Sequence, residues 1–166
     1  MQKSELEDLS EKKDYLMNIL LVDDEPEYLF LLSHYLADHG NKVFTAEHGE
    51  AGLKILDQES VDIIISDVYM PVMDGFKFHK TVRATPKFAK IPFLFVSGFD
   101  DEYTVSAVKS SKLDGFCRKA RPMNELNEWI VYLSTPPEKR SAQRPGQQST
   151  FKDKSRDRDR SLNSRR

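Results

Sequence analysis

Short segments that are apolar on both faces alternate along this chain with segments whose apolar residues recur at helical spacing. A strand without a polar face must be covered on both sides, as happens in the middle of a parallel sheet. Right-handed crossover helices join such strands. The sequence therefore predicts an α/β fold: a five-stranded parallel sheet with helices on both faces. The expected strands are 18–22, 42–46, 61–66, 91–96 and 113–119, and the expected helices run from Pro26 to Gly40 and over 50–58, 76–84, 101–111 and 124–134.

The two ends of the chain differ in composition from this middle part. Residues 1–17 are charged with few apolar positions, so we expect a charged N-terminal arm or a short helix there. From residue 138 onward ten Lys/Arg oppose four Asp/Glu, which leaves a net charge of −8 on the rest of the chain. Because residues 136–166 contain almost no apolar side chains, they are expected to form a disordered basic tail. Residues 18–135 are expected to form one domain of ordinary size.

Several classes of protein are disfavoured by composition. The chain has a single cysteine, so it has no internal disulfide framework, and a reducing compartment fits. It has no apolar run long enough to span a bilayer and no secretory apolar region at its start. We therefore expect a cytoplasmic protein without a membrane partner. Nucleic acid is an unlikely partner, because acidic residues in the basic tail cancel part of the attraction to phosphate.

Polar side chains stand where four of the five predicted strands end. The first strand is followed by Asp23 and Asp24 and the third by Asp67, while Ser97 follows the fourth and Lys119 ends the fifth. The carboxyl ends of parallel strands lie at one edge of an open sheet, where ligands of such folds bind. We expect these five side chains to gather at that edge.

Three carboxylates held close together need a cation, because ionising all of them in one place is unfavourable. Oxygen ligands suit Mg²⁺ (or Mn²⁺), and magnesium keeps coordination positions free for phosphate oxygens. A carboxylate such as Asp67 can also attack phosphorus and form an acyl phosphate. The Lys119 ammonium and the metal would then balance the charge on the transferred group.

The residues at these strand ends resemble the receiver domain of two-component response regulators, the CheY-like family. The resemblance covers about residues 18–134 and rests on four motifs, which are LLVDDEP, IIISDVYMPVMDG, FVSG and DGFCRK. It implies a flavodoxin-like strand order of 2-1-3-4-5. It also implies a signalling switch that accepts a phosphoryl group from a histidine kinase or phosphotransfer protein and signals through a downstream protein partner. Such a switch acts on itself only and is not an enzyme with an external substrate.

The resemblance assigns roles to individual residues. Asp67 would be the phospho-acceptor, Asp24 a direct metal ligand, and Asp23 a ligand through water. Tyr69 would offer its backbone carbonyl to the metal. Ser97 and Phe116 would be the switch residues and Lys119 the phosphate-contacting lysine, while the loop after the acceptor would be shaped by Met70, Pro71, Asp74 and Gly75. The partner surface would be the fourth helix, fifth strand and fifth helix, with Tyr103, Phe116 and Trp129 as its first candidates for contact.

One position departs from the family pattern. The family has proline after its lysine with a cis peptide bond, whereas Ala120 follows Lys119 here. A cis bond before a non-proline residue costs about 2.5–4 kcal/mol. We therefore expect either a trans Lys119–Ala120 bond or a strained cis bond.

Two other functions remain open at this point. A metal-dependent phosphohydrolase would also use an aspartyl phosphate, but such enzymes commonly carry a second acid two residues later, where this chain has Tyr69. A receiver-shaped interaction module that is never phosphorylated is the other possibility. The replacement of proline by Ala120 favours it, and the intact set of acids opposes it.

Overall fold

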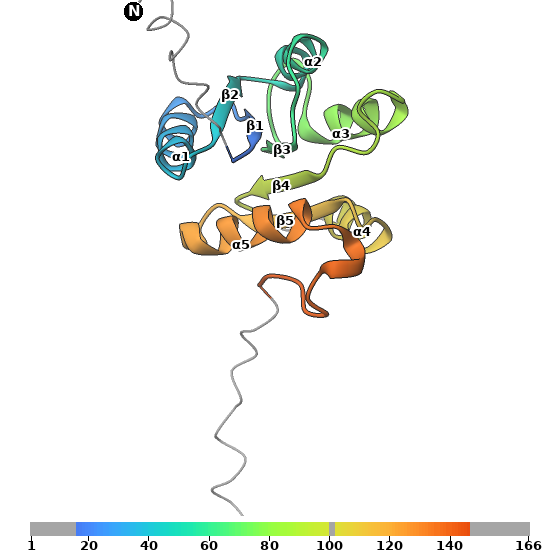
Figure 1. Cartoon of the computed structure of the whole chain (residues 1–166). Coiled ribbons are helices and arrows are strands. Elements are labelled where there is room, and N and C mark those ends of the chain that lie inside the picture. The colour runs from blue at the N-terminus through green and yellow to red at the C-terminus, as the bar shows by residue number, and fades with distance from the viewer. Residues whose placement is uncertain (1–15, 100–101, 147–166) are drawn as a thin grey trace, which may run out of the picture.

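The computed structural model describes residues 16–99 and 102–146. They form a five-stranded parallel sheet in the order β2-β1-β3-β4-β5, which confirms the predicted fold (Figure 1). All four pairs of neighbouring strands are parallel, so the carboxyl ends of the strands lie along one edge of the sheet. The strands are β1 (Asn18–Val22), β2 (Lys42–Ala46), β3 (Ile63–Ser66), β4 (Phe93–Ser97) and β5 (Asp114–Arg118).

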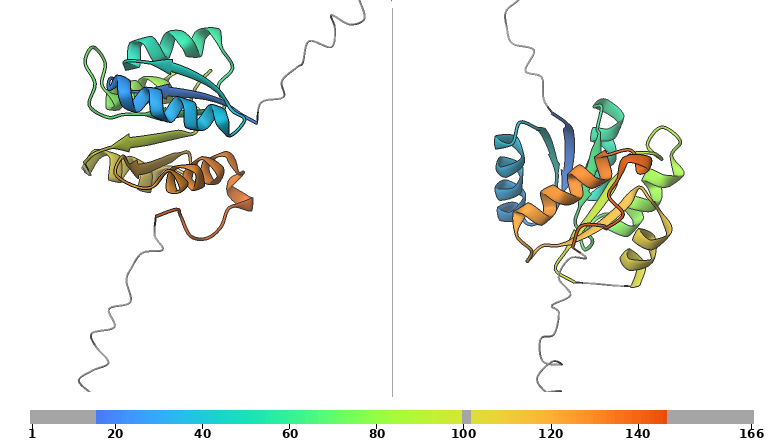
Figure 2. Two further views of the ribbon diagram at one scale, coloured as in Figure 1. Left: turned by 90° about the vertical axis from the view of Figure 1, so that its left-hand side faces the viewer. Right: turned by 60° about the horizontal axis from the view of Figure 1, so that its bottom comes forward.

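Five helices cover both faces of the sheet. α1 and α5 lie on one face, and α2, α3 and α4 lie on the other (Figures 1 and 2). Observed and predicted boundaries agree within two residues. The helices are α1 (Pro26–Asp38), α2 (Gly49–Gln58), α3 (Gly75–Ala84), α4 (Glu102–Ser110) and α5 (Met123–Ser134).

The core consists of two apolar layers separated by the sheet. Successive side chains of a strand point to opposite faces, so Ile19 and Leu21 of β1 pack toward α1 and α5 while Leu20 and Val22 pack toward α2 and α3. The helix α1 contributes Leu32 and Leu36 to this core. Leu31, which shares their helical spacing, is 56% exposed. The first helix therefore presents a narrower apolar face than its spacing suggests.

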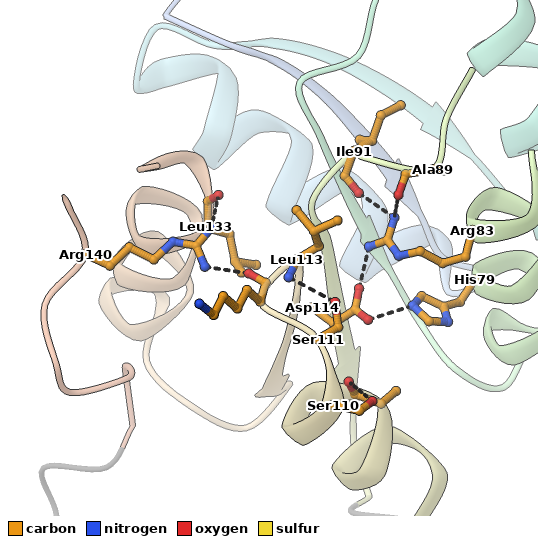
Figure 3. A network of polar contacts seen from close by, with 12 residues as sticks. His79, Arg83, Ala89, Ile91, Ser110, Ser111, Leu113, Asp114, Leu133 and Arg140 are labelled. Atoms are coloured by element: carbon orange, nitrogen blue, oxygen red, sulfur yellow. Dashed lines mark hydrogen bonds and ion pairs between the residues drawn. The ribbon is translucent and has the colours of Figure 1, made fainter. Parts of the chain in front are cut away.

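A buried polar network joins α3 to the start of β5, at the edge of the sheet opposite the acidic strand ends (Figure 3). The carboxylate of Asp114 accepts hydrogen bonds from His79, at 3.0 Å, and from Arg83. Burial opposes ionisation of Asp114, but the hydrogen bond to His79 and the charge of Arg83 together lower its pKa. Arg83 also donates to the backbone carbonyl of Ile91 at 2.7 Å, so one guanidinium fixes the connection into β4.

The C-terminal segment differs from the expectation of disorder from residue 136 onward. Residues 137–139 form a 3-10 helix, and the chain remains packed against the domain as far as residue 146. Arginine side chains, rather than apolar ones, hold this segment, which is why hydrophobic patterning missed it. Residues 1–15 of the predicted arm and residues 147–166 of the predicted tail lie outside the described residues. Among those that are described, no helix is long and apolar enough to cross a membrane.

Candidate functional site: an acidic cluster at the carboxyl edge

Two aspartates follow neighbouring strands and extend their ladder. The backbone N–H of Asp23 donates to Ala46 of β2 at 3.0 Å, and that of Asp67 donates to Val22 of β1 at 2.8 Å. Both residues are buried. Their carboxylates therefore meet at the sheet edge, as the sequence predicted.

A cluster of three carboxylates and one ammonium occupies this edge. Carboxylate oxygens of Asp23, Glu25 and Asp67 all lie within 4.8 Å of one another. The amino group of Lys119 lies 2.9 Å from Asp23 Oδ2, 2.9 Å from Glu25 Oε1 and 3.3 Å from Asp67 Oδ2. Lys119 thus contacts every acid of the cluster. Of the five residues that the sequence placed at this edge, Asp23, Asp67 and Lys119 are in direct contact.

Glu25 joins the cluster although the sequence pointed to Asp24. The backbone N–H of Glu25 donates to Asp23 Oδ1 at 2.8 Å, a turn in which an aspartate caps the residue two positions later. This turn directs Glu25 back over the cluster. Asp24 is exposed and lines a neighbouring hollow with Pro26 and Phe30, and its carboxylate is not one of the three that cluster. The third acid in the motif LLVDDEP was the available sequence signal for Glu25.

Burial and charge crowding raise the proton affinity of this site. Burial raises the pKa of Asp67 to about 6, the charge of Asp23 adds to the rise, and Lys119 opposes it. Burial also raises the pKa of Asp23, against hydrogen bonds from Lys119 and Glu25. For Lys119, burial alone would lower the pKa, but hydrogen bonds to Asp23 and Glu25 more than offset burial and raise it.

The donor set of this site fits a hard divalent cation. Three carboxylates face a single ammonium, so the cluster has an excess of negative charge. The charge of Asp23 adds to the rise that burial causes in the pKa of Asp67, and Lys119 offsets only part of that rise. Oxygen donors in this number are what Mg²⁺ uses when it keeps several of its waters.

Lys119 also lies against an aromatic ring of α1. Its amino group stands 4.6 Å from the centre of the Tyr28 ring, a distance at which the ring attracts a cation. Tyr28 is one turn into α1, directly after the acidic residues. The ring restricts where the lysine can move and keeps its charge directed at the acids.

The loop after Asp67 is shaped by a close backbone approach at its end. Gly75 donates its N–H to Val68 at 2.7 Å, and a Cβ at Gly75 would lie 2.2 Å from the carbonyl oxygen of Asp67. No side chain fits in that space. Asp74 begins α3 by accepting the N–H of Lys77 at 2.8 Å. Asp74 and Gly75, two of the four residues that the sequence placed in this loop, therefore have structural roles.

The remaining loop residues divide between core and surface. Met70 is buried in the layer beneath α2 and α3, while Pro71 is exposed and accepts the N–H of Met73. Val72 between them has a φ of 65°, which is rare for a β-branched residue. The Tyr69 side chain is exposed and packs edge-on against Phe76. This tight turn keeps the backbone after Asp67 close to the cluster.

The predicted switch residues lie next to Lys119 in the fold. The N–H of Lys119 donates to the carbonyl of Ser97 at 3.0 Å, and the buried Ser97 hydroxyl accepts from Phe99 at 3.3 Å. Phe116 is half-buried, on the side of the sheet that α4 covers. All peptide bonds of the described residues are trans. The bond from Lys119 to Ala120 is therefore the trans bond that was one of the two expected forms.

Trp129 does not lie on the surface where partner contacts were expected. It is 4% exposed and packs in the core layer of α1 and α5 with its ring over Gly115. Tyr103 and Phe116 are half-buried and keep part of their surface accessible. Trp129 shares the helical spacing of Leu126, Ile130 and Leu133, all of which are buried, so the spacing of α5 indicates an inward tryptophan. The expectation of a surface contact came from the family resemblance alone.

The fold and the site together define a class: a flavodoxin-like α/β protein with an acidic cluster at the carboxyl edge of its sheet. Comparison with known proteins narrows the class. Residues 19–131 match the profile described as the response regulator receiver domain. The chain belongs to this family of two-component signalling modules, which confirms the resemblance seen in the sequence. Receiver domains are generally non-enzymatic, bind Mg²⁺ at an acidic pocket, and interact with histidine kinases and downstream effectors.

Individual relatives agree with this assignment. The chain is 37% identical over 90 residues to a probable chemotaxis protein CheY of Rhizobium etli, covering 54% of this chain and 70% of the relative. The chemotaxis response regulator CheY4 of Vibrio cholerae has a similar structure, with a TM-score of 0.64, 31% identity, and coverage of 70% and 98%. The regulator TrrA of Thermotoga maritima, solved in complex with Mg²⁺ and BeF, has a TM-score of 0.62 and 29% identity, with coverage of 71% and 99%.

Proposed function

We propose that this chain is a phosphorylation-dependent switch in which Asp67 accepts a phosphoryl group from a histidine kinase or a phosphotransfer protein. One observation carries the proposal: the carboxylates of Asp23, Glu25 and Asp67 converge, and the ammonium of Lys119 reaches all three. A structural role would favour fewer charges, because burying unbalanced carboxylates is unfavourable. Their retention at the ligand-binding edge of the fold supports a function that needs them.

The two oxygens of Asp67 have different surroundings. Oδ1 accepts the N–H of Val68 at 2.7 Å, which fixes the orientation of the carboxylate, and Oδ2 faces Lys119. An oxygen of Asp67 attacks the phosphorus of a phosphohistidine. An O–P bond forms, the P–N bond breaks, and the imidazole nitrogen of the donor leaves with the electron pair. Lys119 then exchanges its contact with Asp67 for a phosphoryl oxygen and balances its charge.

A divalent cation, Mg²⁺ or Mn²⁺, would be held by the same acids. Asp23, Glu25 and Asp67 offer carboxylate oxygens, with Asp24 as a further candidate after a small movement of its turn, and the Tyr69 carbonyl adds a neutral oxygen. When bound, the ion neutralises charge on the phosphoryl oxygens. The magnesium complex of the similar TrrA regulator supports this part of the proposal.

Ser97 and Phe116 are the proposed route from the site to a partner. The Ser97 hydroxyl, now an acceptor for Phe99, would turn to donate to a phosphoryl oxygen. The β4–β5 connection would move with it, and the half-buried Phe116 ring would respond. A downstream protein would then read the surface of α4, β5 and α5, with Tyr103 and Phe116 as contacts and Trp129 as its buried support.

Labelling with a small phosphodonor tests the proposal. The chain is incubated with Mg²⁺ and acetyl phosphate, and intact mass spectrometry follows the added phosphoryl group. Asp67→Asn should abolish the label, while Asp57→Asn, at an exposed position on α2, should leave it unchanged. A label that survives Asp67→Asn, or no label on the unaltered chain, would refute the assignment.

The same preparation separates the two other functions. The proposed switch acts on itself alone, through autocatalytic phosphorylation and dephosphorylation, so sustained turnover of a generic phosphomonoester would instead indicate a phosphohydrolase. Partner binding that is indifferent to Asp67→Ala would indicate an interaction module that is not phosphorylated.

A further inference from the structure

The segment after α5 folds back over the surface that α4, β5 and α5 form. Residues 137–146, here called the strap, leave the end of α5 and run along the β5 side of the sheet toward α4 (Figures 1 and 2). β5 is an edge strand, so one row of its backbone groups has no neighbouring strand. The strap therefore lies beside an open edge of the sheet.

The first anchor of the strap is Arg140 at the end of α5. Its guanidinium donates to the carbonyls of Thr135 at 2.7 Å and Leu133 at 3.1 Å, and to the carbonyl of Lys112 in the turn before β5 (Figure 3). The last carbonyls of a helix lack partners within the helix and favour a nearby cation. The ring of Tyr132 lies 5.0 Å from the same guanidinium. Arg140 thus caps α5 and fixes the direction in which the strap departs.

The second anchor joins the strap to α4. Arg144 donates to the carbonyl of Val108 at 2.7 Å, which is in the last turn of α4 and needs a partner for the same reason. Two residues later Gly146, with a φ of 78°, lies against the carboxylate of Glu125 in the first turn of α5; a Cβ there would stand 2.9 Å from Glu125 Oε1. The strap therefore spans from the end of α5 to α4 and back to the start of α5.

The strap bridges this surface without filling it. A cavity of about 350 Å³ remains beneath Arg144, Pro145 and Gly146, with Val105, Phe116 and Trp129 among its other walls. A volume of this size holds on the order of ten water molecules. Two arginine anchors and little apolar packing hold the strap, so it is a cover that can open while the domain stays folded.

We infer that the strap is an intramolecular occupant of the α4–β5–α5 surface, and that it is released when the site at Asp67 is loaded. The first part rests on the anchors alone. The second part rests on the proposed function, in which phosphorylation of Asp67 moves α4 and β5. The hydrogen bond from Arg144 forms only while the carbonyl of Val108 keeps its place in α4. The coupling is reciprocal: whatever loosens the strap strengthens loading by the same factor.

The single tryptophan of the chain reports on the cover. Trp129 lines the cavity below the strap, so opening should expose its ring to solvent. We expect Arg144→Ala and Gly146→Val to raise the acrylamide quenching constant of Trp129 and to shift its emission to the red. Gly146→Val leaves both arginines in place and acts through the unfavourable φ and the close approach of its Cβ to Glu125 Oε1. Lys139→Ala removes an exposed strap charge whose side chain makes no hydrogen bond or ion pair within the described residues, and it should leave the fluorescence as in the unaltered chain.

A second comparison tests the coupling. With Mg²⁺ and beryllium fluoride the unaltered chain should show the same rise in quenching, and Asp67→Asn should not. Arg144→Ala should bind beryllium fluoride about two- to fivefold more tightly than the unaltered chain. Unchanged quenching in both strap variants would overturn the cover. Adduct formation, seen as a thermal shift, without a change in quenching would overturn the coupling. Failure to form any adduct would refute the proposed function and the coupling with it, while the first comparison still decides whether the strap covers the surface.

Discussion

Replacing Asp67 with asparagine should stabilise the metal-free protein. The carboxyl of Asp67 is 6% exposed, lies beside Asp23, and has its pKa raised by burial from 3.8 to about 6. A group that binds its proton more tightly in the folded state destabilises that state whenever it is ionised. This rise in pKa corresponds to about 3 kcal/mol of destabilisation above pH 6, since each unit of pKa is equivalent to about 1.36 kcal/mol. Asparagine removes this charge at the same size, but it also loses the 3.3 Å contact with Lys119 as an ion pair.

We therefore expect Asp67→Asn to raise the free energy of unfolding by about 1–3 kcal/mol at pH 7.5 in EDTA. The gain should vanish below about pH 3, where Asp67 is protonated in both the folded and the unfolded state, and grow as the pH rises from there to about 6. Urea unfolding followed by circular dichroism at several pH values measures it, with Asp57→Asn on the exposed side of α2 as the control. Magnesium should reverse the order, because an ion at 100 times its Kd adds about 2.7 kcal/mol to the unaltered chain alone.

Two results would refute this reasoning. A variant that is less stable than the unaltered chain in EDTA would mean that Lys119 compensates the charge of Asp67 fully. A difference in stability that does not change between pH 4 and pH 7.5 would mean that asparagine acts through packing rather than through charge.

Three further substitutions test the framework around the site. Asp114→Ala leaves the His79 ring and the partly buried Arg83 guanidinium without their carboxylate and should cost about 3–5 kcal/mol in urea unfolding; a loss below 1 kcal/mol would contradict a buried network. Val72→Gly relieves a φ of 65° and should raise stability by about 1 kcal/mol in thermal melts, and a loss would contradict strain there. Gly75→Ala places a Cβ against the Asp67 carbonyl and should cost about 1–3 kcal/mol and slow labelling by acetyl phosphate, whereas Gly98→Ala, which meets no atom within 4 Å, should change neither.

The secondary structure and the chemistry of the site were predictable from the sequence, because both depend on local patterns. Short apolar runs identify the strands within two residues of their observed ends. Parallel strands all end at the same edge, so the polar residues that follow β1, β3, β4 and β5 had to be neighbours. Asp67 and Lys119 were predicted in this way, and the structure brings them to 3.3 Å.

The identity of the third acid was not predictable in the same way. Asp24 and Glu25 are adjacent in the chain, and which of them turns toward Asp67 depends on the short turn between β1 and α1. Periodicity also failed for one position of α1. Leu31 shares the apolar character and helical spacing of Leu32 and Leu36, yet it is exposed and they are buried. Packing against neighbouring elements decides such cases, and helical spacing does not encode those neighbours.

The sequence by itself determined the order of strands and helices, the edge at which the acids gather, and the chemistry available there. Tertiary structure alone decided which residues that are far apart in the chain become partners. The examples are the pairing of His79 with Asp114 and the hydrogen bond of Arg144 to α4. Those contacts join polar side chains to groups on other elements. Their energy depends on distance and burial in the folded chain, for which a linear pattern of residue types carries no signal.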